Sequence, residues 1–186
     1  MPRGLLFLTL VAWALVPGTL SAQETLTPSN LPEFLARYDQ TFDPLDAAYD
    51  ELINENLPLR NEEGQPLVRR PIEDRRRALA DLREIARQLA AQPQDVVLTT
   101  KLVFRTESLA DDLFDLSQMA FDNDREELGK RLADLQATMD HNKELLAAYL
   151  LTRAAQMQER IGQLEREKVE LERKLREAQR PPKTRP

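Results

Sequence analysis

The residues of this chain best suited to chemistry are three aspartates in the stretch Asp111-Asp112-Leu113-Phe114-Asp115. Asp111 and Asp115 have i,i+4 spacing, so on a helix their carboxylates lie on one face. Carboxylate oxygens are the ligands that Mg²⁺ and Ca²⁺ prefer. The stretch therefore has two interpretations, a cation site or an acidic helix face in contact with water.

The same stretch resembles the Asp-Asp-x-x-Asp pattern with which all-helical isoprenoid synthases hold magnesium and a diphosphate. The resemblance implies an enzyme that acts on diphosphates, but it is confined to Asp111–Asp115. Such enzymes need a second acidic motif on a facing helix, a deep cavity and a longer chain, and this sequence has no second motif. We therefore interpret the cluster as a solvated acidic face and predict neither a metal nor another cofactor.

The remaining reactive residue types form no catalytic set. His141 is the only histidine, so the metal motifs that need two histidines are excluded, and we expect it at an exposed or boundary position. Ser108 and Ser117 lack the glycines of a nucleophile elbow. There are no cysteines, and the 5 glycines form no phosphate-binding loop. The sequence thus predicts a protein that is not an enzyme.

Composition is that of long helices in water. Charged residues make up 31% of the 186 positions and aromatic residues only 5%. The formal net charge of -6 disfavours non-specific binding to nucleic acids. The apolar residues are periodic, which argues against disorder of the whole chain.

The first 22 residues have the layout of an export signal. Arg3 supplies a positive charge, Leu5–Val16 is an apolar run, and Pro17-Gly18 precedes a small residue at Ala22. We expect cleavage near Ala22-Gln23 and a periplasmic or secreted product, with an uncleaved anchor as the alternative. No second apolar run follows, so we expect no stable membrane span after cleavage.

A polar lead-in at 23–29 precedes a predicted antiparallel bundle of about four helices over residues 30–151, hence an all-α fold. The first helix, capped by Ser29 or Asn30, should be kinked or divided by Pro44. Its apolar seam is more typical of a core than of a ligand platform. The seam residues are Phe34, Tyr38, Phe42, Leu45, Tyr49 and Leu52.

Two further helices are predicted between the first helix and the long last helix. One starts at Pro71 and ends at Gln92-Pro93. Its basic run Arg75–Arg77 is expected to be solvated or to pair with the acidic first helix rather than to bind phosphates. The next runs over 96–121, where Val97, Val103, Phe114 and Phe121 are expected to widen its apolar face. Asp124 and Glu127 predict a capping box after a break, although a continuous helix is an alternative.

The segment 57–71 is the one stretch without helical periodicity. Short apolar runs on either side of Gly64 predict a small β-hairpin. Pro58 and Pro66 confine any strand there to an edge. We expect the loop to cap the bundle by burying Leu59 and Val68, the alternative being a functional loop.

The last predicted helix runs from Asp124 to about Gln179 and contains no proline. Its part at 152–179 keeps a heptad seam that predicts a coiled-coil extension, and the proline-rich 180–186 predicts a disordered tail. Lys168 interrupts the seam and can set its register. The seam residues, which are our candidate partner-binding site, are Met157, Ile161, Leu164, Lys168, Leu171 and Leu175.

These observations predict an exported, non-enzymatic interaction or scaffold protein. The expected partner is a protein, either another copy of the chain or another helical envelope protein, bound through the C-terminal coiled coil. The alternative is an extracytoplasmic bundle that acts as a chaperone or binds a ligand on a concave apolar surface near the aromatic first helix.

Overall fold

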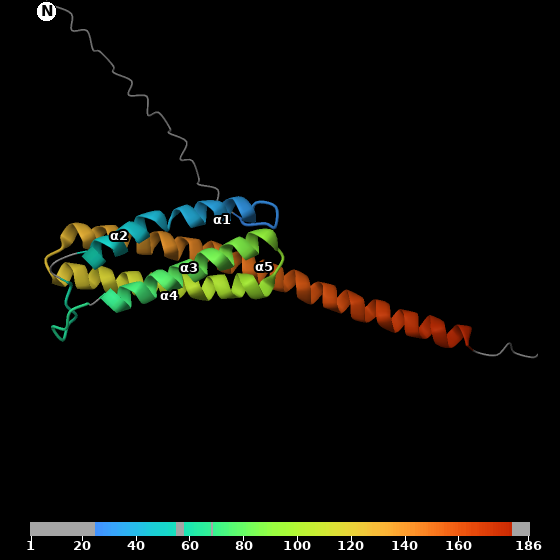
Figure 1. The fold of residues 1–186 in the computed structure, drawn as a ribbon. Helices are drawn as coiled ribbons and strands as arrows, with labels where there is room; N and C mark the ends of the chain where they lie inside the picture. The colour runs from blue at the N-terminus through green and yellow to red at the C-terminus, as the bar shows by residue number, and fades with distance from the viewer. Residues whose placement is uncertain (1–24, 55–57, 68, 180–186) are drawn as a thin grey trace, which may run out of the picture.

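A computed structural model describes residues 25–54, 58–67 and 69–179. It is all-helical, and its helices pack as an antiparallel bundle from which the last helix projects (Figure 1). The expected signal at 1–22 and tail at 180–186 lie outside the described residues. The helices are α1 Leu31–Gln40, α2 Asp43–Asn54, α3 Arg69–Ala91, α4 Val96–Asp122 and α5 Glu126–Ala178.

Helices α1 and α2 together form one bent rod, as Pro44 predicts. Pro44 has no N–H to donate, and α1 ends at Gln40 before α2 starts at Asp43. The Thr41 hydroxyl donates to the Tyr38 carbonyl at 2.6 Å and helps to close α1. The bent rod, α3, α4 and the first half of α5 are therefore the four members of the bundle.

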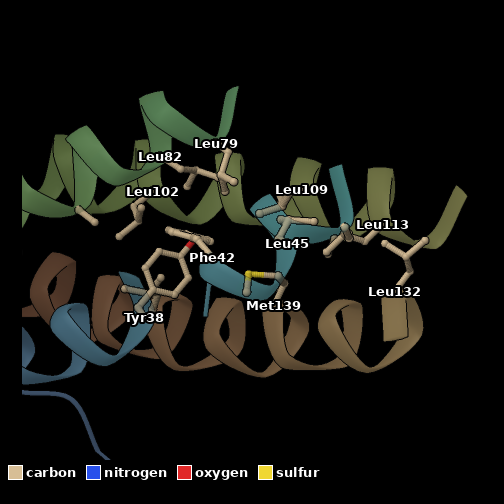
Figure 2. Close-up of a cluster of buried hydrophobic side chains, with 14 of the residues drawn as sticks. Tyr38, Phe42, Leu45, Leu79, Leu82, Leu102, Leu109, Leu113, Leu132 and Met139 are labelled. Carbon is tan, nitrogen blue, oxygen red and sulfur yellow. The ribbon is translucent and has the colours of Figure 1, made fainter. Parts of the chain in front are cut away.

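The core lies between these four members (Figure 2). All six seam residues of the first predicted helix are buried, so the prediction of a core role for them is confirmed. Tyr38 and Phe42 meet edge to face with ring centroids 4.7 Å apart, a favourable aromatic geometry. Leu132 and Met139 bring α5 to the same core, and both are fully buried.

Of the basic run Arg75–Arg77, only Arg76 pairs with α2; Arg75 lies against Asp112 of α4 and Arg77 against Asp74 of α3 itself. Arg76 bonds Asp50 at 2.8 Å and Arg83 bonds Asp46 at 2.9 Å. The Arg83 guanidinium also lies 5.4 Å from the centre of the Phe42 ring. These pairs orient the first rod against α3.

The helix ends follow the predicted punctuation only in part. Asn30 is the N-cap residue of α1 but its side chain makes no capping hydrogen bond, and α3 starts at Arg69 rather than at Pro71. Asp95 caps α4 by accepting from the Leu98 N–H at 2.9 Å. The predicted break after α4 is present, but the Asp124–Glu127 capping box is wrong. Asp124 adopts a left-handed conformation, with φ 58°, that closes the turn, and the N-cap residue is Arg125.

The predicted hairpin is present as a small loop with one antiparallel bridge between Arg60 and Pro66. Gly64 takes φ 75°, which suits glycine at the tip of a turn. Leu59 is buried, so this loop caps the end of the bundle, while Val68 lies outside the described residues. The loop lies at the opposite end of the bundle from the projecting part of α5 (Figure 1).

Helices α4 and α5 approach closely at Gly129. An added Cβ there would meet the Phe121 ring at 2.9 Å, and the Ser117 hydroxyl donates to the Gly129 carbonyl at 3.0 Å. The expectation that four residues widen the apolar face of α4 is confirmed only for Val103, which packs against the core. It is wrong for Val97, Phe114 and Phe121, which are 64%, 50% and 37% exposed. The bundle has no fifth rod to cover that side of α4 among the described residues.

Candidate functional site

The C-terminal part of α5, residues 152–179, is the candidate site, and we call it the arm. It leaves the bundle beyond the connection between α3 and α4 and projects away from it (Figure 1). Arg153 donates to the Gln94 side chain at 3.3 Å, and the Tyr149 hydroxyl donates to the Pro93 carbonyl. These contacts mark the level at which the bundle ends on this side of α5.

Every apolar residue of the predicted seam is substantially exposed on the arm. Met157 and Leu164 are 46% and 47% exposed, Ile161 and Leu175 are 53% and 59%, and Leu171 is 66%. Lys168 is also exposed. No other described segment of the chain covers these side chains, which we call the stripe.

Ion pairs along the arm support its helix. Glu170 and Lys174 lie 2.8 Å apart, and Glu172 and Arg176 lie 3.6 Å apart, both at i,i+4 spacing. Exposed pairs of this kind stabilise a helix by about 0.3–0.5 kcal/mol each. They support the helical backbone of the arm while the apolar side chains remain open to solvent.

The arm differs from the bundle half of α5 only in what covers it. Leu128, Leu132, Met139 and Leu146 are 2% exposed or less, and they repeat at the same heptad-like spacing as the stripe. An apolar stripe in water is a site that another helix can cover, since covering it removes apolar surface from water. The arm therefore presents an exposed apolar surface along its length.

The aspartate cluster does not converge on one point. Asp112 lies 3.4 Å from Arg75 of α3, whereas Asp111 and Asp115 are exposed. Among the described residues, no group of three histidine or acidic side chains is arranged to hold a metal ion. The cluster thus combines one contact between helices with a face in water.

His141 is exposed and borders a cavity of about 270 Å³ at the base of the arm. Thr25 and Leu26, before α1, form one wall, and Glu144 and Tyr149 of α5 are on the other. Burial raises the pKa of Tyr149, and the nearby Arg153 opposes this effect. His141, Glu144 and Thr152 of α5 are polar residues that line this cavity, which shares no lining residue with the stripe.

A second apolar surface was not predicted from the sequence. Phe104 of α4 is 64% exposed and borders a groove of about 570 Å³ that also contacts Asp81 and Ile85 of α3. Its neighbours Lys101 and Arg105 are charged, so the local pattern gives no warning of an aromatic patch. The aromatic residues of the first rod, where sequence reasoning placed a possible ligand surface, are buried instead.

None of the helices within the described ranges combines the length and apolar character needed to cross a membrane. No protein-family model, curated protein or solved structure shows significant similarity to this chain.

Proposed function

We propose that the protein is an exported, non-enzymatic interaction or scaffold protein that binds another helical protein chain through the stripe on its arm. One observation carries this proposal, namely the run of exposed apolar side chains along a helix that continues beyond its bundle. Soluble proteins rarely leave such a continuous apolar surface without a partner. The export signal predicted at 1–22 is the basis for the proposed location.

The size of the stripe decides what strength of binding to expect. Complete burial of a leucine, isoleucine or methionine side chain contributes about 1.5–3 kcal/mol, so covering the exposed half contributes roughly 1 kcal/mol. Two arms that covered each other's stripes would gain on the order of 10 kcal/mol, against an association cost of about 4–15 kcal/mol. The smallest association cost leaves about 6 kcal/mol, so we expect reversible binding with a dissociation constant of roughly tens of micromolar at the tightest.

Two apolar residues of the arm make a matched test. Leu171 lies on the stripe and Val169 lies off it, and both are 66% exposed. Leu171→Asp should weaken association, because it places a charge where a partner must bind, and Val169→Asp should leave it unchanged. The measurement is mass in solution by light scattering, together with recovery of bound envelope proteins on the immobilised full chain. Equal behaviour of the two variants would contradict the proposal.

A second candidate function follows from the exposed Phe104 beside its groove. A bundle with this surface would bind an apolar ligand or an unfolded client, as a chaperone does. Fluorescence of an apolar dye should then fall in Phe104→Ser and not in Leu171→Asp. A dye signal that depends on Leu171 alone would assign apolar binding to the arm and reject this second function.

A further inference from the structure

We propose that the arm pairs in antiparallel orientation with the arm of a second copy of the same chain, in a register centred on Arg166. This inference rests on the proposed function and specifies its partner. It follows from the direction in which the stripe faces relative to the bundle, from the point at which the bundle ends, and from the heptad positions of the stripe.

The stripe lies on the same side of α5 as the bundle core. Met157 follows Met139 by about five complete turns of a helix with 3.6 residues per turn, and Leu164 follows Leu146 by the same interval. Met139 and Leu146 are fully buried against the rest of the bundle. On a straight α5, the exposed Met157 and Leu164 therefore face the side on which α1, α2 and α4 lie further back along the helix.

Because the stripe faces the same side of α5 as the bundle core, two arms cannot pair in parallel and in register. A partner helix on the stripe that ran parallel to the arm would continue alongside residues 126–150 of α5. The space on that side is already filled by the other rods, whose side chains bury Leu132, Met139 and Leu146. An antiparallel partner avoids the collision, because its own bundle then lies beyond the tip of the arm.

The ends of the arm determine how far two antiparallel copies can overlap. At the base, the α3–α4 connection contacts Arg153 through Gln94, so an approaching helix can extend to about Ala154. At the tip, α5 ends at Ala178. When Ala154 of one copy lies opposite Ala178 of the other, the overlap is greatest and the two-fold axis passes by Arg166.

The same register satisfies the heptad pattern. It brings Met157 opposite Leu175 of the second copy and Ile161 opposite Leu171. Each residue at heptad position a then meets a residue at position d of the second copy, as antiparallel coiled coils require. Lys168 then lies opposite Leu164 of the second copy and next to that copy's Glu165 and Glu167. Its ammonium can reach their carboxylates, whereas in a parallel pair two Lys168 ammonium groups would face each other.

The paired segment is about 36 Å long, or between three and four heptads, which is close to the lower limit for a coiled coil. Chain concentration therefore decides whether pairing is observed. Experiments should use roughly 1 mM chain, well above the tens of micromolar expected for the tightest dissociation constant.

Electron-spin distance measurements on the full chain separate the orientations. The chain has no cysteine, so single substitutions can be labelled cleanly at Thr152→Cys and Arg166→Cys, both of which point away from the stripe in the heptad pattern. In the antiparallel pair the Arg166→Cys labels lie level with each other, and the Thr152→Cys labels are displaced by about 42 Å along the axis. Light scattering on each labelled variant checks that it still associates.

The outcomes distinguish this proposal from the proposed function. A much longer distance for Thr152→Cys than for Arg166→Cys supports antiparallel pairing, and equal distances in a dimer overturn it. A chain that remains monomeric at this concentration also overturns it. If that monomer still binds a different purified protein and loses the binding in Leu171→Asp, the proposed function stands. If it shows no binding that depends on Leu171, both fail.

Discussion

The hydroxyl oxygens of Tyr38 and Thr106 lie 2.7 Å apart in the core and connect α1 to α4. Thr106 also donates to the Leu102 carbonyl at 2.8 Å, so in this pair Tyr38 is the donor. Both side chains are buried, and their hydrogen bond is a specific contact in a core made largely of leucine. It fixes how the first rod lies on α4.

Replacing Thr106→Val removes the acceptor while keeping the shape of the side chain. The Tyr38 hydroxyl would then be buried without a partner, which costs about 1–3 kcal/mol of the free energy of unfolding. The double variant Tyr38→Phe with Thr106→Val should recover most of this loss, because no donor remains. Urea unfolding of the single and double variants measures the difference. Additive losses in the double variant would contradict the assignment.

Stability should decline in alkaline solution because of the buried tyrosines. Burial raises the pKa of Tyr38 and of Tyr49. The unfolded chain therefore loses these protons first, near the ordinary tyrosine pKa of about 10. Stability is complete below that pH and is lost as the pH rises above it.

The decline is measured as the free energy of unfolding between about pH 8 and pH 11, with tyrosinate absorbance recorded on the same samples. Tyr38→Phe removes one of the shifted groups, so its stability should fall less steeply with pH than that of the native chain. A stability that stays constant across this range, or a slope that the substitution does not change, would contradict burial of the Tyr38 hydroxyl.

Two glycines of α5 should respond oppositely to alanine. Gly129→Ala places a methyl group against the Phe121 ring, and the overpacking should cost about 1–3 kcal/mol, which exceeds the helix-propensity gain of about 1 kcal/mol. Gly162 on the arm has only the Arg166 guanidinium near, at 4.0 Å, so Gly162→Ala should raise helicity. Thermal unfolding followed by circular dichroism compares them. Stabilisation by Gly129→Ala would show that the Phe121 ring moves aside easily.

Arg83 is expected to contribute more than an ordinary surface arginine. It reaches Asp43 at 3.1 Å and Asp46 at 2.9 Å while stacking over Phe42, and its side chain is only 25% exposed. Arg83→Gln should cost about 1–2 kcal/mol of unfolding free energy, because neighbouring carboxylates lose their shared cation.

Arg77, paired with Asp74 on the outer face of α3, is the matched control for Arg83. Its side chain is largely exposed, so Arg77→Gln should change the free energy of unfolding by less than about 0.5 kcal/mol. Denaturant unfolding in low and high salt provides the comparison. Equal losses from the two substitutions would show that the cluster around Arg83 acts as a set of ordinary surface pairs.

Asn123 is expected to hold the hairpin-like loop against the α4–α5 turn. Its side chain accepts from the Arg60 N–H at 2.9 Å and donates to the Arg60 carbonyl at 2.8 Å, as a neighbouring strand would. Asn123→Ala should increase hydrogen exchange at residues 58–67 with little effect on helix cores. Unchanged exchange in the loop would mean that the burial of Leu59 alone holds it in place.

Lys168→Leu tests the role of the one charged residue in the stripe. A leucine there completes the apolar seam, so self-association should tighten and larger assemblies should appear. Light scattering over a concentration series measures both effects, with Val169→Leu as a control that adds apolar surface off the stripe. Weaker association of Lys168→Leu would mean that the ammonium makes an essential contact with the partner.

The sequence alone determined the rods, most of their ends and the residues of the core seam. These features depend on local chemistry. Pro44 cannot donate a hydrogen bond, Asp95 can accept one from α4, and Tyr38, Phe42 and Leu45 repeat at helical spacing whatever surrounds them. The hairpin was also predictable, because Gly64 lies where a tight turn needs positive φ.

The tertiary structure decided which apolar residues are covered. Met139 and Met157 have the same sequence pattern, yet one is buried and the other is 46% exposed, because the other rods end at the level of Pro93 and Gln94. Phe104 and Phe114 are exposed for a similar reason, since none of the described helices covers their side of α4. Periodicity shows that a helix has an apolar face, but only the packing of the other helices determines whether that face lies in the core or remains in water.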